Sequence, residues 1–140
     1  MMITFISDEK FVNTRNAVEK GYPQVVMPVK YFVGSIYPNI VGYTSFSDMG
    51  KFYFVGNTYI VPEFRGNGFY KKLLSTRNKH LNDKPKITLV NPIEDTNVAL
   101  LHAQVEKQGG VRVENYKQVC DIMVESLFRE LKKLEVFIYR

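Results

Sequence analysis

The chain has 140 residues, of which 45% are hydrophobic and 14% aromatic. That is enough apolar material for one ordinary core, so we expect a single domain over residues 1–140. The formal net charge of +5 favours an anionic partner, and no apolar run approaches the roughly 20 residues that span a bilayer.

Strand patterns dominate the first half of the chain. Ser7 is a helix cap, and Gly21 with Pro23 ends that helix. Pro28 indicates an edge strand or an entry to the strand near Val29. The predicted elements are a strand over 3–6, a helix over 7–20, a strand over 25–36, a turn at 37–39, and strands over 40–47 and 52–61.

The last of these strands is interrupted and then leads into a glycine turn. Gly56-Asn57 predicts a bulge or a splay within residues 52–61. A short turn containing Gly66 and Gly68 follows, and then a helix. Five apolar side chains recur at helical spacing and are expected to face the core: Phe69, Tyr70, Leu73, Leu74 and Leu81.

Strand and helix patterns alternate in the second half of the chain, which predicts an α/β protein with a mixed sheet. Asp95 or Thr96 is the expected cap of its first helix, and Gly109-Gly110 the expected end. The predicted elements are a strand over 86–90, a helix over 96–108, either one long strand or a strand passing into a helix over 111–124, a helix over 126–133, and a strand over 134–139.

The glycine turn has the pattern of an anion cradle. Glycines at 66 and 68 remove the Cβ atoms that would crowd the turn, so backbone N–H groups from Arg65 to Tyr70 can converge at a helix N-terminus. A dinucleotide fingerprint would need a third glycine, and a P-loop would need Gly-Lys-Ser/Thr. A different phosphate ligand is therefore indicated.

Basic residues cluster around this turn. Lys71 and Lys72 are the better candidates for contacting phosphates, whereas from Arg77 onward we expect a solvated basic helix face. The full set is Arg65, Lys71, Lys72, Arg77, Lys79, Lys84 and Lys86.

The N-terminal sequence and the cysteine and histidine content indicate the cellular compartment and the capacity to bind a metal. Charges soon follow residues 1–5, where a signal peptide would continue with an apolar run. Cys120 is the only cysteine, and with His80 and His102 it gives no metal-ligand spacing. We expect a cytoplasmic protein with no metal site and no membrane association.

Residues 61–68 followed by Leu73-Leu74 resemble the acetyl-CoA motif of the GNAT N-acetyltransferase superfamily, whose pattern is Arg/Gln-x-x-Gly-x-Gly/Ala. Arg65 and Gly68 match this pattern, and Tyr70 stands where the family most often has a small residue. The resemblance extends from about residue 25 to about residue 110. It implies the GNAT fold: a mixed, mostly antiparallel central sheet flanked by helices on both faces.

The resemblance also implies a cofactor and a reaction. Acetyl-CoA would serve as acyl donor, with its pantetheine arm between the fourth and fifth strands and its thioester near residues 57–60, where the Ile60 N–H would polarise the carbonyl. The acetyl group would pass directly to an amine of a small molecule or peptide. The expected cofactor-binding residues are Tyr59, Ile60, Val61, Arg65, Gly66, Asn67, Gly68, Phe69, Tyr70 and Lys71.

The acid and base are not determined by the sequence. Gly56 and Asn57 stand where family members often carry a glutamate, and Val105 or Glu106 stands where they often carry a tyrosine. Tyr116 and Cys120 are candidates. Asp121, Glu125 and His102 are further candidates, each with an alternative interpretation as an ordinary surface or structural residue.

Two other functions compete with the N-acetyltransferase hypothesis. The missing glutamate and tyrosine would suit a catalytically silent acyl-CoA-binding or protein-interaction module on the same fold. The basic charge and residues 51–55 faintly resemble an RNA-binding strand, although that motif's glycines are missing, so nucleic acid is not favoured. A homodimer remains open.

Overall fold

The computed structural model describes residues 1–6, 29–92 and 98–140, and the predicted helix over 7–20 and the cap at Asp95 or Thr96 lie outside them. Contacts group the chain into two compact units, Met1–Ser47 with Gly56–Asp83 and Asp48–Val55 with Lys84–Arg140. Strand β4 (Tyr53–Ile60) contributes to both units.

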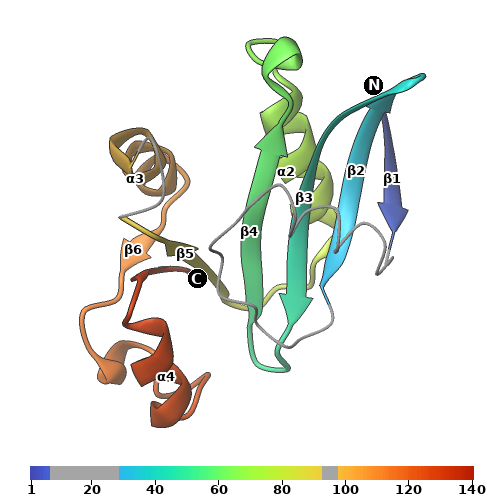
Figure 1. The fold of residues 1–140 in the computed structure, drawn as a ribbon. Coiled ribbons are helices and arrows are strands. Elements are labelled where there is room, and N and C mark those ends of the chain that lie inside the picture. The colour runs from blue at the N-terminus through green and yellow to red at the C-terminus, as the bar shows by residue number, and fades with distance from the viewer. Residues whose placement is uncertain (7–28, 93–97) are drawn as a thin grey trace. The chain divides into compact units, whose positions relative to one another are not determined.

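The first unit is an antiparallel sheet with one described helix (Figure 1). Its order is β1-β2-β3-β4, with β1 at Met2–Ile6, β2 at Lys30–Ile36 and β3 at Asn39–Asp48. A turn at residues 37–38 joins β2 to β3, as predicted. A register shift lies between Gly34 and Ser35 of β2.

Helix α2 (Phe69–His80) packs on one face of this sheet, and tyrosines gather on the other. Leu73 packs with Val41 and Ile60, and the expected core-facing side chains of α2 are all buried or half-buried. On the opposite face the rings of Tyr31 and Tyr43 meet edge to face, with centroids 5.9 Å apart.

The second unit pairs strands of both directions. The start of β4 pairs in parallel with β5 (Lys86–Val90), and β5 pairs antiparallel with β7 (Glu135–Tyr139). β6 is the short strand Val111–Arg112 beside β7. The predicted strands over 86–90 and 134–139 are thus confirmed.

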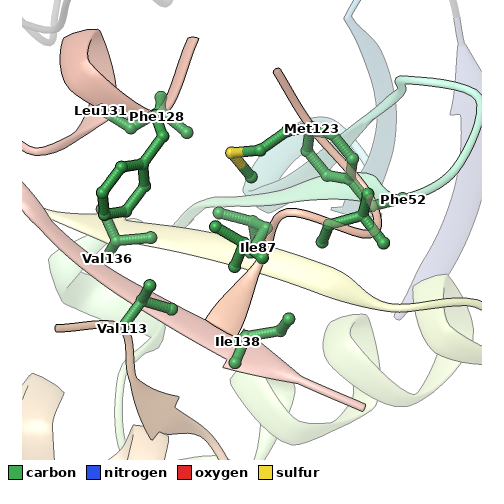
Figure 2. Packing of buried hydrophobic residues seen from close by; sticks show 10 residues of the cluster. Phe52, Ile87, Val113, Met123, Phe128, Leu131, Val136 and Ile138 are labelled. Carbon is green, nitrogen blue, oxygen red and sulfur yellow. The ribbon is translucent and has the colours of Figure 1, made fainter. Parts of the chain in front are cut away.

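Helices cover both faces of the second unit's strands. Because side chains alternate along a strand, Val136 and Ile138 face α4 (Glu125–Leu131), whereas Phe137 faces α3 (Val98–Lys107). Figure 2 shows the packing on the α4 side. The mixed, mostly antiparallel sheet flanked by helices is therefore confirmed.

The α4-side cluster consists of ten buried residues: Phe52, Ile87, Val113, Val119, Ile122, Met123, Phe128, Leu131, Val136 and Ile138.

One predicted element is wrong. Residues 111–124 contain only the two-residue β6, followed by the single 3-10 turn η2 (Tyr116–Gln118) and further turns. The Gln118 side chain accepts hydrogen bonds from the N–H groups of Glu114 and Asn115, which turns the chain away from β7. The apolar residues that suggested a strand are buried from these turns instead.

Candidate anion cradle and acyl-donor strand

The glycine turn joins β4 to α2 through the 3-10 turn η1 (Pro62–Phe64). Gly66 and Gly68 have φ angles of +81° and +77°, in the left-handed region that favours glycine. A Cβ built at either position would meet no atom within 4 Å. The turn therefore has open space above both glycines, as the predicted cradle requires.

Most of the predicted amides are open. Among the residues that the structure describes, none accepts a hydrogen bond from the N–H groups of residues 66–71. The Arg65 N–H differs from the prediction, because it donates to the Pro62 carbonyl oxygen at 3.3 Å. The open set thus begins at Gly66 and runs into the first turn of α2, where the helix dipole also favours an anion.

Arg65 ties the turn to the end of β4. Its Nε donates to the Ile60 carbonyl oxygen at 2.8 Å, and its guanidinium carbon lies 5.5 Å from the centroid of the Tyr59 ring. The rest of this exposed guanidinium remains at the surface beside the turn. Asn67 closes the turn from within, because its Nδ2 donates to the carbonyl oxygens of Phe64 and Arg65 at 3.1 and 3.3 Å.

The side chains that follow the glycines leave the turn open. Phe69 and Tyr70 pack into the apolar cluster of Val41, Ile60 and Leu73, so the large side chain at position 70 does not fill the space above the glycines. Burial raises the pKa of Tyr70, and the charge of Arg77 lowers it by less. Lys71 is exposed on the first turn of α2.

The end of β4 presents backbone groups on its edge away from β3. The Val61 N–H donates to the Val41 carbonyl oxygen at 2.8 Å. Adjacent residues of a strand direct their N–H groups to opposite edges, so the N–H of Ile60 faces away from β3. Among the described residues, β4 pairs with β5 at Tyr53 with Lys86 and at Phe54 with Ile87 and no further, so the predicted interruption at Gly56-Asn57 follows the end of this pairing.

A buried hydroxyl network next to this edge was not predicted from the sequence. The Oγ1 atoms of Thr44 and Thr58 lie 2.7 Å apart, and Arg77 Nη1 donates to Thr44 Oγ1 at 3.1 Å. Ser45 Oγ donates to the Gly56 carbonyl oxygen at 2.7 Å. The sequence signal was the polar run Thr44-Ser45 inside an otherwise apolar strand.

Arg77 corrects a prediction. It was expected on a solvated basic face, but only 5% of its surface is exposed. Its position on α2, one turn after Leu73 and Leu74, directs it to the sheet, and Thr44 provides an acceptor there.

The catalytic candidates Tyr116 and Cys120 belong to the second unit, whereas the glycine turn belongs to the first. The Tyr116 hydroxyl donates to the Met123 carbonyl oxygen at 2.7 Å, and its ring packs against Phe128, which gives it a structural role. Cys120 is exposed, with Sγ 3.4 Å from the Lys117 carbonyl oxygen. The catalytic roles of Tyr116 and Cys120 remain predictions.

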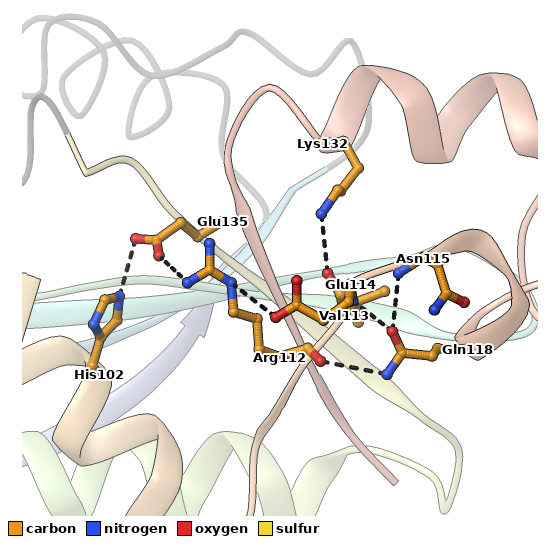
Figure 3. Close-up of polar contacts among 8 residues, drawn as sticks. All are labelled: His102, Arg112, Val113, Glu114, Asn115, Gln118, Lys132 and Glu135. Carbon is orange, nitrogen blue, oxygen red and sulfur yellow. Dashed lines mark hydrogen bonds and ion pairs between the residues drawn. The ribbon is translucent and has the colours of Figure 1, made fainter.

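The other candidate residues lie in or near surface ion pairs or are exposed. Glu135 lies between His102 and Arg112, with each of its oxygens 3.0 Å from one partner (Figure 3). Asp121 forms an ion pair with Arg140, and the hydrogen bond from that guanidinium holds the pKa of Asp121 below its usual range. Glu125 is exposed in the first turn of α4.

Neither a membrane-spanning helix nor a metal-binding cluster occurs among the described residues. In ranges 1–6, 29–92 and 98–140, no helix combines the length and hydrophobicity that crossing a membrane requires. The same residues contain no group of three or more His, Cys, Asp or Glu side chains placed to hold a metal ion.

Comparison with known proteins identifies the fold of this chain. No protein-family model matches the sequence, and no curated protein matches it either. Solved structures do match. An acyl-CoA N-acyltransferase from Pseudomonas aeruginosa superposes with a TM-score of 0.63 at 13% identity, over 99% of this chain and 100% of that one.

Two further structures agree. A GNAT-family acetyltransferase from Bacteroides thetaiotaomicron has a TM-score of 0.60 at 14% identity, over 99% of this chain and 86% of that one. The PaiA N-acetyltransferase from Thermoplasma acidophilum, solved with coenzyme A, has a TM-score of 0.53 at 11% identity, over 94% of this chain and 70% of that one. The chain has the GNAT acyl-CoA N-acyltransferase fold.

Proposed function

We propose that this protein is an N-acetyltransferase that moves an acetyl group from acetyl-CoA directly to an amine. The open amides of residues 66–71 carry the proposal. They lie at the N-terminus of a helix, next to two glycines that have open space where a Cβ would stand. Backbone N–H groups can bind a diphosphate in that space. The GNAT fold supports an acyl-CoA as the ligand.

The remaining predicted residues have corresponding roles. Lys71 adds positive charge beside the cradle, and Arg65 holds the turn to Ile60. The edge of β4 that faces away from β3 would pair with the pantetheine arm as an additional strand does. The Ile60 N–H on that edge would then donate to the thioester carbonyl.

The chemistry requires little beyond positioning. The amine nitrogen attacks the thioester carbon, the carbonyl oxygen becomes an oxyanion, and the C–S bond breaks as its electron pair stays on sulfur. Donors held in place stabilise the oxyanion, and binding both reactants in one site removes most of the entropic cost. Water takes the proton of the attacking amine in the absence of an identified base.

The acceptor is proposed to be an amine of a small molecule or peptide, and the compartment to be the cytoplasm. Acetyl-CoA itself, rather than another acyl-CoA, is the donor that the motif resemblance favours. A homodimer is compatible with this proposal and is not needed for it.

Isothermal titration with acetyl-CoA tests the proposal. We expect saturable binding, competed by free CoA, and release of CoA with at least one amine or peptide from a broad panel. Absence of binding at about 1 mM, the weak end of the affinity scale, would contradict it. Binding without CoA release from any acceptor would favour the silent acyl-CoA-binding module, and salt-sensitive binding of single-stranded oligonucleotides alone would favour a nucleic-acid binder.

A further inference from the structure

The second half of β4, residues 56–60, is paired on one side only. Among the described residues, the pairing of β4 with β5 ends at Phe54, and the neighbouring strand beyond that point is β3. Gly56 has a φ angle of +154°, a conformation that side chains other than glycine rarely adopt. Such a segment needs further contacts to keep one backbone conformation, because glycine is the most flexible residue of a chain.

Three contacts attach this segment to β3. Ser45 Oγ donates to the Gly56 carbonyl oxygen at 2.7 Å, and Thr44 Oγ1 lies 2.7 Å from Thr58 Oγ1. The Val61 N–H, directly after the segment, donates to a backbone carbonyl oxygen of β3 at 2.8 Å. The backbone is therefore attached to β3 at its start, its middle and its end.

The two hydroxyl contacts come from opposite faces of the sheet. Thr44 and Ser45 are adjacent in β3, so their side chains point to opposite faces. Thr44 is fully buried and Ser45 is 3% exposed, and a buried hydroxyl costs free energy unless it is hydrogen-bonded. Because their partners lie on β4, both hydroxyls favour the observed position of residues 56–58 over any displaced one.

The Gly56 carbonyl departs from regular strand alternation. The Val61 N–H faces β3, so regular alternation back along β4 would direct the Gly56 carbonyl oxygen away from β3. It accepts instead from a side chain of β3. Ser45 thus stabilises an irregular conformation at Gly56 that backbone pairing alone would not favour.

We propose that Ser45 is a positioning residue for the acyl donor. Together with Thr44 it fixes residues 56–58, and thereby the direction of the Ile60 N–H, the proposed donor to the thioester carbonyl oxygen. This inference rests on the proposed function, which places the thioester beside residues 57–60. Ser45 lies on the β3 side of β4 and the Ile60 N–H faces the other edge, so Ser45 acts through the backbone and does not touch the ligand.

A fixed N–H matters because charge develops on the carbonyl oxygen only during the reaction. As the amine nitrogen bonds to the carbonyl carbon, that oxygen becomes an oxyanion, and a donor already aimed at it stabilises the charge without reorganising. The C–S bond then breaks with its electron pair on sulfur, and the amine proton goes to water. A misplacement of about 1 Å can cost roughly 100-fold in rate, so small shifts of β4 are consequential.

The test measures the bound acyl donor, because the amine acceptor is unidentified. Isotope-edited infrared spectra of bound acetyl-CoA report the thioester carbonyl stretch, which falls when that oxygen accepts a hydrogen bond. Ser45→Ala removes the hydrogen bond to Gly56. Phe32→Leu is the control for lost stability, because Phe32 is a buried side chain of β2 whose ring contacts Phe46 and His80.

We expect the carbonyl stretch to rise in Ser45→Ala and to stay at the wild-type value in Phe32→Leu, although both variants lose stability in urea denaturation. Affinity for free CoA, which lacks the thioester, should be unchanged in Ser45→Ala. With any amine found active, kcat rather than KM should change in Ser45→Ala, with a fall of up to about 100-fold. If Ser45→Ala does not fold, Thr58→Val releases the same segment from the other face and replaces it, with the same expected rise.

The outcomes separate this inference from the function on which it rests. If the wild type does not bind acetyl-CoA, the proposed function fails, and this inference fails with it. If the wild type binds and the carbonyl stretch is the same in Ser45→Ala, the role of Ser45 is wrong while the proposed function stands. A stretch that rises equally in Phe32→Leu would also overturn the inference, because it would show a general loosening of the sheet.

Discussion

At the scale of single residues, backbone conformation decides what the glycine turn can do. Gly66 and Gly68 adopt positive φ angles above open space, while Arg65 and Asn67 bond to the carbonyl oxygens of β4 and η1. The side chains thus stabilise the turn, and the amides that follow remain available. A ligand at this position would be held mainly by backbone donors.

A substitution at Gly68 tests whether the turn binds CoA or only connects β4 to α2. Gly68→Val should abolish CoA binding, because the added branches occupy the space above the amides, and it should cost about 1–2 kcal/mol for a side chain in the left-handed region. Gly109→Val is matched, since Gly109 has φ +85° and equally open space at the end of α3. Calorimetric affinities that fall equally in both variants, or in neither, would show that the turn is only a connector.

Arg77 should contribute to stability as a buried hydrogen-bond donor. Arg77→Ala should lower the free energy of unfolding by about 2–3 kcal/mol, because bonds to a charged group are lost and the Thr44 oxygen loses its donor. Lys79→Ala, at an exposed position of the same helix, should change it by less than about 0.5 kcal/mol. Urea denaturation measures both, and equal effects would contradict the role given to Arg77.

The raised pKa of Tyr70 makes the free energy of unfolding vary with pH in the alkaline range. Its pKa is raised by burial, so the folded protein keeps a proton that the unfolded chain loses above the ordinary tyrosine pKa of about 10. That contribution is fully present below about pH 10 and is lost as the pH rises through the folded-state pKa. Tyr70→Phe should therefore flatten the alkaline decline in urea unfolding, whereas Tyr37→Phe, at a side chain 96% exposed, should leave the decline unchanged.

At the scale of elements, the close approach of β3 and β4 depends on one glycine. A Cβ at Gly42 would lie 2.3 Å from the Tyr59 carbonyl oxygen, which is backbone and cannot move without disturbing β4. The partner of Gly42 on β2 is Gly34, where the atoms nearest to a Cβ belong to the Met1 side chain, with its sulfur at 2.6 Å. The two paired glycines therefore differ in what surrounds them.

Gly42→Ala should destabilise the protein by about 1–3 kcal/mol or more, the usual cost of overpacking, and should weaken acetyl-CoA binding because β4 is displaced. Gly34→Ala should cost less than about 1 kcal/mol, since a methionine side chain adjusts readily. Thermal denaturation compares the two variants, and a larger loss in Gly34→Ala would contradict this account of the β3–β4 approach.

At the scale of the whole molecule, β4 supplies residues to both compact units, with Tyr53–Val55 in one and Gly56–Ile60 in the other. The expectation from chain length is one domain over residues 1–140, and it remains a prediction.

Native-state hydrogen exchange tests that prediction. If the chain is one cooperative domain, the most protected amides of β2 and of β7 should exchange with the same opening free energy, and both values should shift equally in Gly42→Ala. Protection that falls only for β2 would show two units that unfold separately.

The glycine turn, the helix after it and most strands follow from local signals. Glycine spacing and apolar periodicity depend on residues close together in the chain, so the presence of α2 and the extents of β5 and β7, within a residue or two, could be predicted. The same local signals failed over residues 111–124, because the Gln118 side chain bonds to backbone N–H groups and competes with strand formation.

By itself, the sequence determined the alternation of strands and helices and the chemistry of the open amides, because these depend on neighbours along the chain. Only the tertiary structure decided that Arg77 is buried, that Thr44 and Thr58 share a hydrogen bond, and that Gly42 lies against the Tyr59 carbonyl. These contacts join residues from separate elements. Their energies depend on distance and burial, which no local pattern in the chain records.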